Sequence, residues 1–169
     1  VVKQTTETGL SAWSSFSGEM AAKGVDVQTF NQSVIEVVAP PEVAAGLQIA
    51  SDSRVILLDR VRGYDKTPAV WFRSWFHPRL GITKDQKFEI PLYSLVEQNF
   101  GVRAELSREE ITAEAAEKDV AARLRVKSGS PLLVRRRVVR DRNGSIIEYA
   151  LNYYRPDRFN YAIEIKREQ

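Results

Sequence analysis

Apolar residues in the second half of the chain follow the two-residue period of β-strands. Residues 131–140 and 146–154 are rich in Val, Ile, Leu and Tyr, and Asn143-Gly144 lies between them. This pattern predicts a β-hairpin closed by a tight primed turn, because Asn-Gly tolerates positive φ at two successive positions.

The polar residues of the second hairpin strand are predicted to lie on one face. Side chains alternate between faces along a strand, so Glu148, Asn152 and Tyr154 fall in one row. A carboxylate, an amide and a phenol in one row indicate a polar pocket, in which Glu148 would accept hydrogen bonds from a ligand. The alternation leaves two other readings open, a solvent-exposed Glu148 and a Tyr154 that belongs to the core.

A helix-and-hairpin pattern occurs twice along the chain. Residues 42–62 align without gaps with residues 119–139, and eight positions are identical at an offset of 77 residues. After the hairpin turn the offset between the two copies grows to 78, so Pro78 aligns with Pro156. Two copies are too few for a solenoid, which needs at least about three repeats. The pattern therefore predicts one antiparallel sheet built from two related halves.

Shorter patterns predict the remaining elements. Pro40-Pro41 precedes a short helix, since proline is tolerated in a first turn, and Gly101 ends an amphipathic helix. The expected elements are a helix at 16–23, a strand within 25–38, a helix at 42–47, strands at 54–64 and 69–76, a helix at 91–99 and a strand at 159–166.

Residues 103–124 fit two different patterns. Residues 107–110 form a capping box, and local rules extend a helix from residue 108 to 124. In the first copy of the repeat, Pro40-Pro41 stops the equivalent helix from extending upstream. The repeat therefore predicts a strand over 103–114 and a helix over 117–124.

Composition excludes several classes of site. The net charge of +3 is too small to indicate a nucleic-acid surface by itself, and we interpret the arginine-rich run 135–142 as a solvated face paired with Asp and Glu. The chain has no cysteine and one histidine, His77, which we interpret as structural. We predict no metal and no cofactor. No apolar run approaches the ~20 residues of a membrane span, and no signal peptide opens the chain, so we expect a soluble, cytoplasmic protein with no membrane partner.

Two stretches have the residue types of an anion site. Arg60 and Arg62 share a strand face, and two arginines so spaced can hold a carboxylate or phosphate. The alternative is a solvated edge strand whose arginines extend into water. Phe16 and Ser17 open the first predicted helix, where free N–H groups and the helix dipole favour an anion. The alternative there is ordinary N-capping.

Four stretches, in their order and spacing, resemble one known family. They are FSGEMAAKG (16–24), LQIASDSRVILLDRVR (47–62), LYSLVEQNFGV (92–102) and GSIIEYALNYYRPDRF (144–159). The chain resembles the UTRA domain, the effector-binding domain of HutC-type regulators in the GntR family. This resemblance implies an α+β, chorismate-lyase-like fold over residues 11–169, an antiparallel sheet with flanking helices.

The resemblance also implies partners. Family members carry a winged helix-turn-helix before this domain, so residues 1–10 are expected to be a linker or frayed strand from an absent N-terminal DNA-binding domain. We expect contact with operator DNA only through that domain. We also expect a homodimer, because two-fold operators require two-fold protein symmetry.

Family motifs can be carried over to single positions of this chain. The Arg-x-Arg strand of sugar-phosphate-sensing members resembles Arg60 and Arg62, and their phosphate-binding helix start resembles Phe16 and Ser17. The Ser-x-Tyr motif at the middle helix resembles Pro91 and Tyr93, so its serine is replaced. The resemblance adds the Glu and Tyr of the last hairpin, which match Glu148 and Tyr154.

The resemblance favours an effector sensor over two alternatives. The sensor would bind a small anionic metabolite, a sugar phosphate or a carboxylate, and control DNA binding; it would not be an enzyme and would have no catalytic residue. The first alternative is a chorismate-lyase-like enzyme, with Arg60 holding a carboxylate and Glu148 as general acid. The second is a protein-interaction module with an empty pocket.

Overall fold

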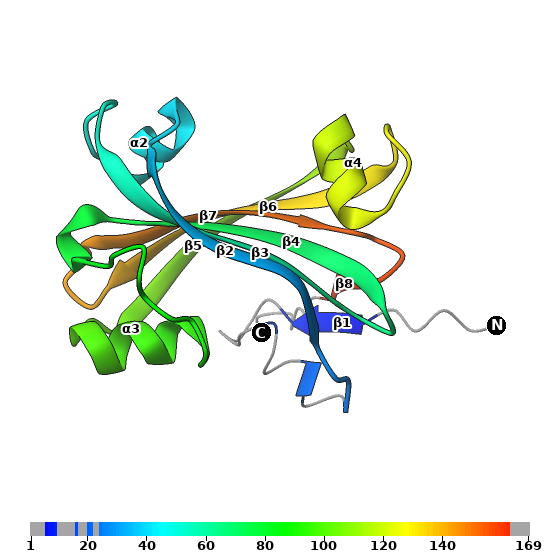
Figure 1. Cartoon of the computed structure of the whole chain (residues 1–169), viewed down its shortest axis with the longest axis horizontal. Coiled ribbons are helices and arrows are strands. Elements are labelled where there is room, and N and C mark those ends of the chain that lie inside the picture. Colours follow the sequence, from blue (N-terminus) through cyan, green and yellow to red (C-terminus); the bar gives the residue numbers. More distant parts are fainter. Residues whose placement is uncertain (1–5, 10–15, 17–19, 22–23, 163–169) are drawn as a thin grey trace, which may run out of the picture.

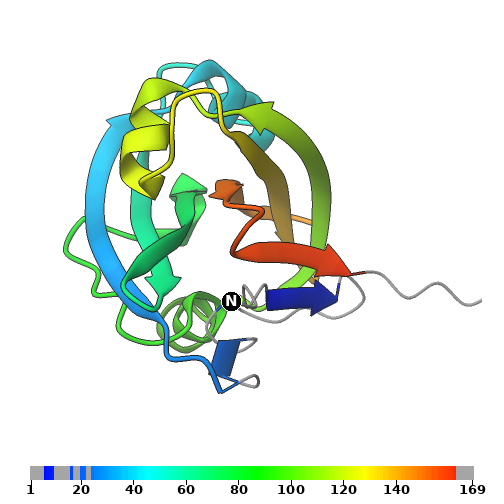
Figure 2. The ribbon, with the colours of Figure 1, turned by 90° about the vertical axis from the view of Figure 1, so that its right-hand side faces the viewer.

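A curled six-stranded antiparallel sheet forms the body of the protein (Figure 1). The computed structural model describes residues 6–9, 16, 20–21 and 24–162. The strand order is β2-β3-β4-β7-β6-β5, and the edge strands β2 and β5 lie on opposite sides of the curl in Figure 2. A separate parallel pair joins β1 to β8. The strands are β1 Thr6–Gly9, β2 Gln28–Val38, β3 Arg54–Tyr64, β4 Thr67–Phe76, β5 Ala104–Ala115, β6 Pro131–Asp141, β7 Ile146–Tyr154 and β8 Phe159–Ala162.

The sheet consists of two related halves that meet between β4 and β7. Helix α2 (Pro41–Leu47) and helix α4 (Lys118–Leu124) begin and end 77 residues apart, as do β3 and β6. Both helices end at a left-handed residue, Gln48 with φ 57° and Arg125 with φ 54°. The β4–β7 register is symmetric about the pair Arg73–Leu151, two residues that the repeat makes equivalent. The predicted α+β sheet of two halves is confirmed.

Each repeat helix covers a strand of the other half. Helix α4 packs against β4 and helix α2 packs against β7, both on the same side of the sheet (Figure 1). Leu47 and Leu124 are fully buried at equivalent positions of the two helices. Trp75 on β4 and Tyr149 on β7 belong to the same apolar cluster. Neither half therefore buries its apolar face without the other.

The structure decides between the two patterns of residues 103–124. Strand β5 pairs with β6 along its whole length, and helix α4 begins only at Lys118. The strand and helix predicted from the repeat are confirmed, and the longer local helix is wrong. Pairing with β6 satisfies the backbone groups along one side of this acidic segment, so tertiary context outweighs its helix propensity.

The turn of the second hairpin differs from the prediction. In the second hairpin only Gly144 has positive φ (77°), and Asp141 Oδ1 accepts hydrogen bonds from the N–H groups of Asn143 and Ser145. The primed Asn-Gly turn is therefore wrong, because the Asp141 side chain organises a longer turn. The two-residue primed turn occurs in the first hairpin, where Asp65 and Lys66 have φ of 51° and 59°.

The other side of the sheet carries helix α3 (Leu92–Phe100), which ends at left-handed Gly101 as predicted. Leu95 and Val96 pack there against residues of the sheet. A short 3₁₀ helix, Pro78–Leu80, begins after His77, whose Nδ1 accepts from the Arg79 N–H. Most of the predicted helix 16–23 and the end of the predicted strand 159–166 lie outside the described residues. Within the described ranges, no helix is long and apolar enough to cross a membrane.

Candidate functional site

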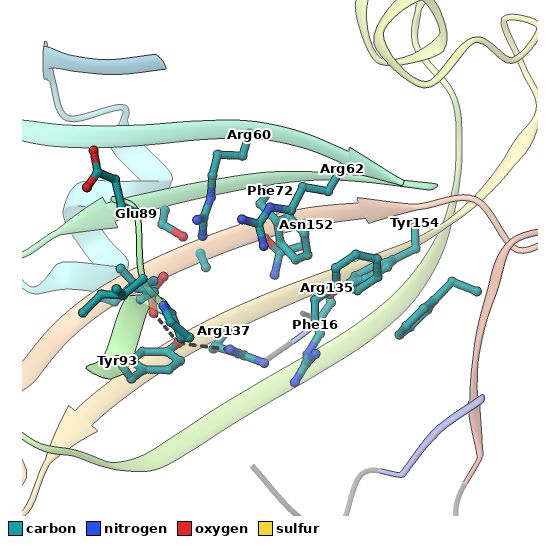
Figure 3. A pocket seen from close by; sticks show the side chains of 17 residues that line it. Phe16, Arg60, Arg62, Phe72, Glu89, Tyr93, Arg135, Arg137, Asn152 and Tyr154 are labelled. Atoms are coloured by element: carbon teal, nitrogen blue, oxygen red, sulfur yellow. Dashed lines mark hydrogen bonds between the residues drawn. The ribbon is translucent and has the colours of Figure 1, made fainter. Parts of the chain in front are cut away.

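A pocket of about 220 Å³ lies on the side of the sheet that carries α3 (Figure 3). Strands β3, β4, β6 and β7, the start of α3, Phe16 and Phe159 supply its lining. Strand alternation selects the lining residues. On β3, Arg60 and Arg62 point into the pocket, whereas Val61 between them packs into the apolar cluster of α2 and α4.

Arg60 lies in this pocket without an acidic partner. Its side chain is 8% exposed, its Nε is buried without a hydrogen bond, and no ion pair joins it to another described residue. Burial, and then the neighbouring Arg62, lowers the pKa of Arg60 to about 10, so it stays charged at neutral pH. Because β3 is paired on both sides, with β2 and β4, the edge-strand alternative for Arg60 and Arg62 is wrong.

Hydrogen bonds connect α3 to β7 and β6 across the pocket. The Tyr93 hydroxyl donates to Glu148 Oε2 (2.5 Å) and accepts from Arg137 Nη1 (3.0 Å) (Figure 3). Glu148 is only 2% exposed, so the solvent-facing alternative is wrong. Burial and the charge of Glu148 raise the pKa of Tyr93, so the hydroxyl keeps its proton. Glu148 is a buried acceptor that retains lone pairs for further donors.

Strand β6 contributes two arginines that the sequence interpretation placed on a solvated face. Arg135 and Arg137 line the pocket, and their side chains are 13% and 12% exposed. That interpretation is wrong for these two residues, although both do pair with an acid, Glu109. The interpretation as a solvated, acid-paired arginine holds for Arg136, which lies between them on the other face, is 29% exposed and pairs with Glu42 and Glu114.

Aromatic side chains close one end of the pocket. Tyr154 stacks on Phe159 with ring centroids 4.5 Å apart, and Phe16 meets Phe72 edge to face at 5.4 Å. Tyr154 is 2% exposed, so it belongs to an apolar cluster and lines the pocket at once. Ser17, predicted beside Phe16, lies outside the described residues.

Asn152, which strand alternation placed in the polar row of β7 but which was not among the predicted ligand contacts, also lines the pocket. It is 3% exposed, and its Oδ1 is buried without a hydrogen bond among the described residues. It lies opposite Arg135 across the β6–β7 ladder. Within the part of the chain that the structure describes, no group of His, Cys, Asp and Glu is placed to hold a metal ion. The site is therefore a polar, arginine-rich pocket with one aromatic end.

Comparison with known proteins identifies the family. The family model of the UTRA domain matches residues 22–160. The chain belongs to the UTRA domain family. The transcriptional repressor NagR of Bacillus subtilis is 25% identical over 163 residues, which cover 96% of this chain and 67% of NagR.

Solved structures share the UTRA fold. PhnF from Mycobacterium smegmatis has a TM-score of 0.84 at 19% identity, over 97% of this chain and 73% of PhnF. The ligand-binding domain of a putative GntR-family regulator from Bordetella bronchiseptica has a TM-score of 0.73 at 25% identity, over 84% and 89% of the two chains. This UTRA domain is thus an effector-binding domain of the GntR-family regulators.

Six of the seven predicted site residues line the UTRA pocket. Those six are Phe16, Arg60, Arg62, Tyr93, Glu148 and Tyr154, and Ser17 lies outside the described residues. Their contact with a ligand stays a prediction. The prediction missed Arg135 and Arg137, although strand alternation would have found them, whereas it had already placed Asn152 in the polar row of β7. Arg135 and Arg137 share the face of β6 that continues the row of Glu148 and Asn152 across the hairpin.

Proposed function

We propose that the pocket binds a small anionic metabolite, and that its occupancy controls DNA binding by a winged helix-turn-helix attached upstream. Arg60 is the observation that carries this proposal. A buried guanidinium without an acidic partner destabilises the fold, and an anion bound to it would restore the missing interactions. With Arg62 on the same strand face, it forms a pair suited to carboxylate or phosphate oxygens.

The rest of the pocket suits an uncharged, hydroxyl- or amine-bearing body. Glu148 and Asn152 offer buried acceptor oxygens, which gain stability from ligand donors because buried polar groups are costly when unsatisfied. Tyr154 and Phe159 provide an aromatic wall. The volume of about 220 Å³ lies below the ~300–1,000 Å³ of sites for drug-sized molecules. These features support a small polar metabolite.

The regulatory part of the proposal rests on the relatives, which are transcriptional regulators of the GntR family. We propose a homodimer, because two DNA-binding domains attached to a two-fold assembly match the symmetry of a two-fold operator. Sedimentation that finds only monomer for the complete regulator at micromolar concentration would contradict the dimer.

A thermal-shift screen of phosphorylated sugars and small carboxylates tests the pocket. A true effector at a hundredfold excess over its Kd stabilises the fold by about 2.7 kcal/mol. Arg60→Ala should weaken binding by roughly 1.5–3 kcal/mol, the size of a charged hydrogen bond. Arg54→Ala is the matched control, since Arg54 lies on the same strand but is 61% exposed and paired with Glu36. Wild-type affinity in both Arg60→Ala and Glu148→Ala would refute the site.

A chorismate-lyase-like enzyme remains the second candidate. Arg60 and Glu148 line the same pocket, which is the arrangement that this alternative requires. A carboxylate substrate would bind Arg60, and Glu148 would act as general acid. Incubation of the protein with chorismate decides the question: turnover that Glu148→Gln abolishes would support the enzyme, and its absence would leave the sensor.

A further inference from the structure

Glu109 lies behind the pocket wall and pairs with the two pocket-lining arginines of β6, Arg135 and Arg137. It is a residue of edge strand β5 and does not line the pocket. Its Oε2 accepts a hydrogen bond of 2.5 Å from Arg135 Nε. Its Oε1 lies 2.9 Å from Arg137 Nε, an ion pair without hydrogen-bond alignment. The Ser107 hydroxyl donates to the same Oε1 at 2.8 Å. One carboxylate thus bridges two pocket arginines.

This carboxylate is a permanent negative charge at neutral pH. Burial by itself would raise the pKa of Glu109, but the hydrogen bond from Arg135, the charges of Arg137 and Arg135 and the hydrogen bond from Ser107 hold it below its ordinary value of 4.5. The two arginines have further fixed partners. Arg135 Nη1 donates to the Tyr161 hydroxyl (2.7 Å), and Arg137 Nη1 donates to the Tyr93 hydroxyl (3.0 Å).

The β6 side and the β3 side of the pocket therefore differ in how much arginine charge is left to bind an anion. On β6, the guanidiniums of Arg135 and Arg137 both pair with Glu109, whereas on β3 no described residue forms an ion pair with Arg60. Among the described residues, four arginines and two glutamates, Glu89 and Glu148, line the pocket, and Glu109 behind it is the acid that pairs with Arg135 and Arg137. The repeat makes Arg60 and Arg137 equivalent positions, so the acid on β5 distinguishes them.

We propose that Glu109 is a specificity-determining residue, a resident counter-ion that directs the effector's anionic group to Arg60 and disfavours doubly charged groups relative to singly charged ones. This inference rests on the proposed function. Glu109 acts through Arg135 and Arg137 and touches no ligand. Coulomb energy is proportional to the charge of the ligand, so removal of this carboxylate should strengthen the binding of a dianion more than that of a monoanion.

Sulfate and formate are suitable probes, since they carry two and one negative charges. We would titrate each at constant ionic strength and follow the Nε–H resonances of the pocket arginines by NMR. Glu109→Gln is expected to bind formate about threefold and sulfate about tenfold more tightly than wild type, because the gain in free energy doubles with the charge.

Two further variants separate charge from scaffolding. Glu109→Asp keeps the charge and should keep wild-type affinity for both anions. Glu110→Gln makes the same charge change on the same strand, but Glu110 is 61% exposed and paired with Arg108, so its affinities should not change. Equal or weaker sulfate binding in Glu109→Gln would overturn the inference, as would no binding at all by that variant. Tighter binding in Glu109→Asp would also overturn it.

A parallel titration of Arg60→Ala separates this inference from the proposed function. If Arg60→Ala loses sulfate binding while Glu109→Gln equals wild type, only the role of Glu109 is contradicted. If Arg60→Ala binds sulfate as wild type does, the anion site itself is contradicted.

Discussion

At Arg60, burial and the charge of Arg62 disfavour the charged side chain, whereas the charge of Glu148 favours it. The side chain lines the pocket, where desolvation of its guanidinium, and then the charge of Arg62, lowers its pKa to about 10. The attraction of Glu148 offsets part of this cost. A group that destabilises the empty domain but suits an anion is typical of a binding site.

Replacement of Arg60 by methionine tests this balance. Met occupies a similar volume without the charge, so Arg60→Met should stabilise the ligand-free domain by roughly 1–4 kcal/mol, the range found when buried charges are replaced by apolar residues. Urea denaturation measures the change. Arg54→Met, on an exposed part of the same strand, should stay within about 0.5 kcal/mol of wild type. Destabilisation by Arg60→Met would show that Arg60 holds the fold.

At the scale of elements, helix α2 packs closely on β7. A Cβ added at Gly46 would lie 2.3 Å from Tyr149 Cδ2, inside any normal contact. Tyr149 is 5% exposed. Its hydroxyl donates a hydrogen bond to Glu42 of α2, the helix that carries Gly46, so the ring cannot move away freely. The equivalent position of α4 is Arg123, whose guanidinium lies over Trp71. The two repeat helices thus place different side chains at this position.

Gly46→Ala should therefore reverse the usual helix preference. In an exposed helix interior, Ala is about 1 kcal/mol more favourable than Gly. Here the methyl group meets the Tyr149 ring, and overpacking of this kind costs about 1–3 kcal/mol. Thermal unfolding should show a lower Tm for Gly46→Ala. The variant Tyr149→Leu makes room for the methyl group, so adding Gly46→Ala to it should cost little further stability. If Gly46→Ala costs as much in Tyr149→Leu as it does in the wild type, the steric explanation is contradicted.

At the scale of the whole molecule, the crossed packing of α2 and α4 joins the two halves. Each helix covers a central strand of the opposite half, and β4 and β7 pair directly. The apolar surface of either half is therefore exposed when the other half unfolds. We expect one cooperative transition, in spite of the internal repeat.

Leu47→Ala and Leu124→Ala probe this cooperativity at equivalent positions. Both leucines are 0% exposed, so each truncation should destabilise the fold by about 2–5 kcal/mol. Both variants should shift the same single transition, followed by tryptophan fluorescence and by circular dichroism. Transitions that separate between the two probes in either variant would show that the halves unfold independently.

The sequence by itself determined the parts of this protein that depend on local order. The two-residue period placed Arg60 and Arg62 on one face of β3, and Glu148 and Tyr154 on one face of β7, because a strand's geometry alternates its side chains wherever the strand lies. The repeat also predicted the helix at 117–124 and not at 108–124, and α4 spans Lys118–Leu124. These features need only the identities of neighbouring or repeated residues.

Only the tertiary structure decided which groups meet. Glu109 reaches Arg135 because β5 pairs with β6 in one particular register, and a shift by one residue would turn it to the other face. Tyr93 reaches Glu148, 55 positions away, because α3 packs across the sheet. The free energy of such contacts depends on burial and on the distance between distant segments, which the local pattern of residues does not contain.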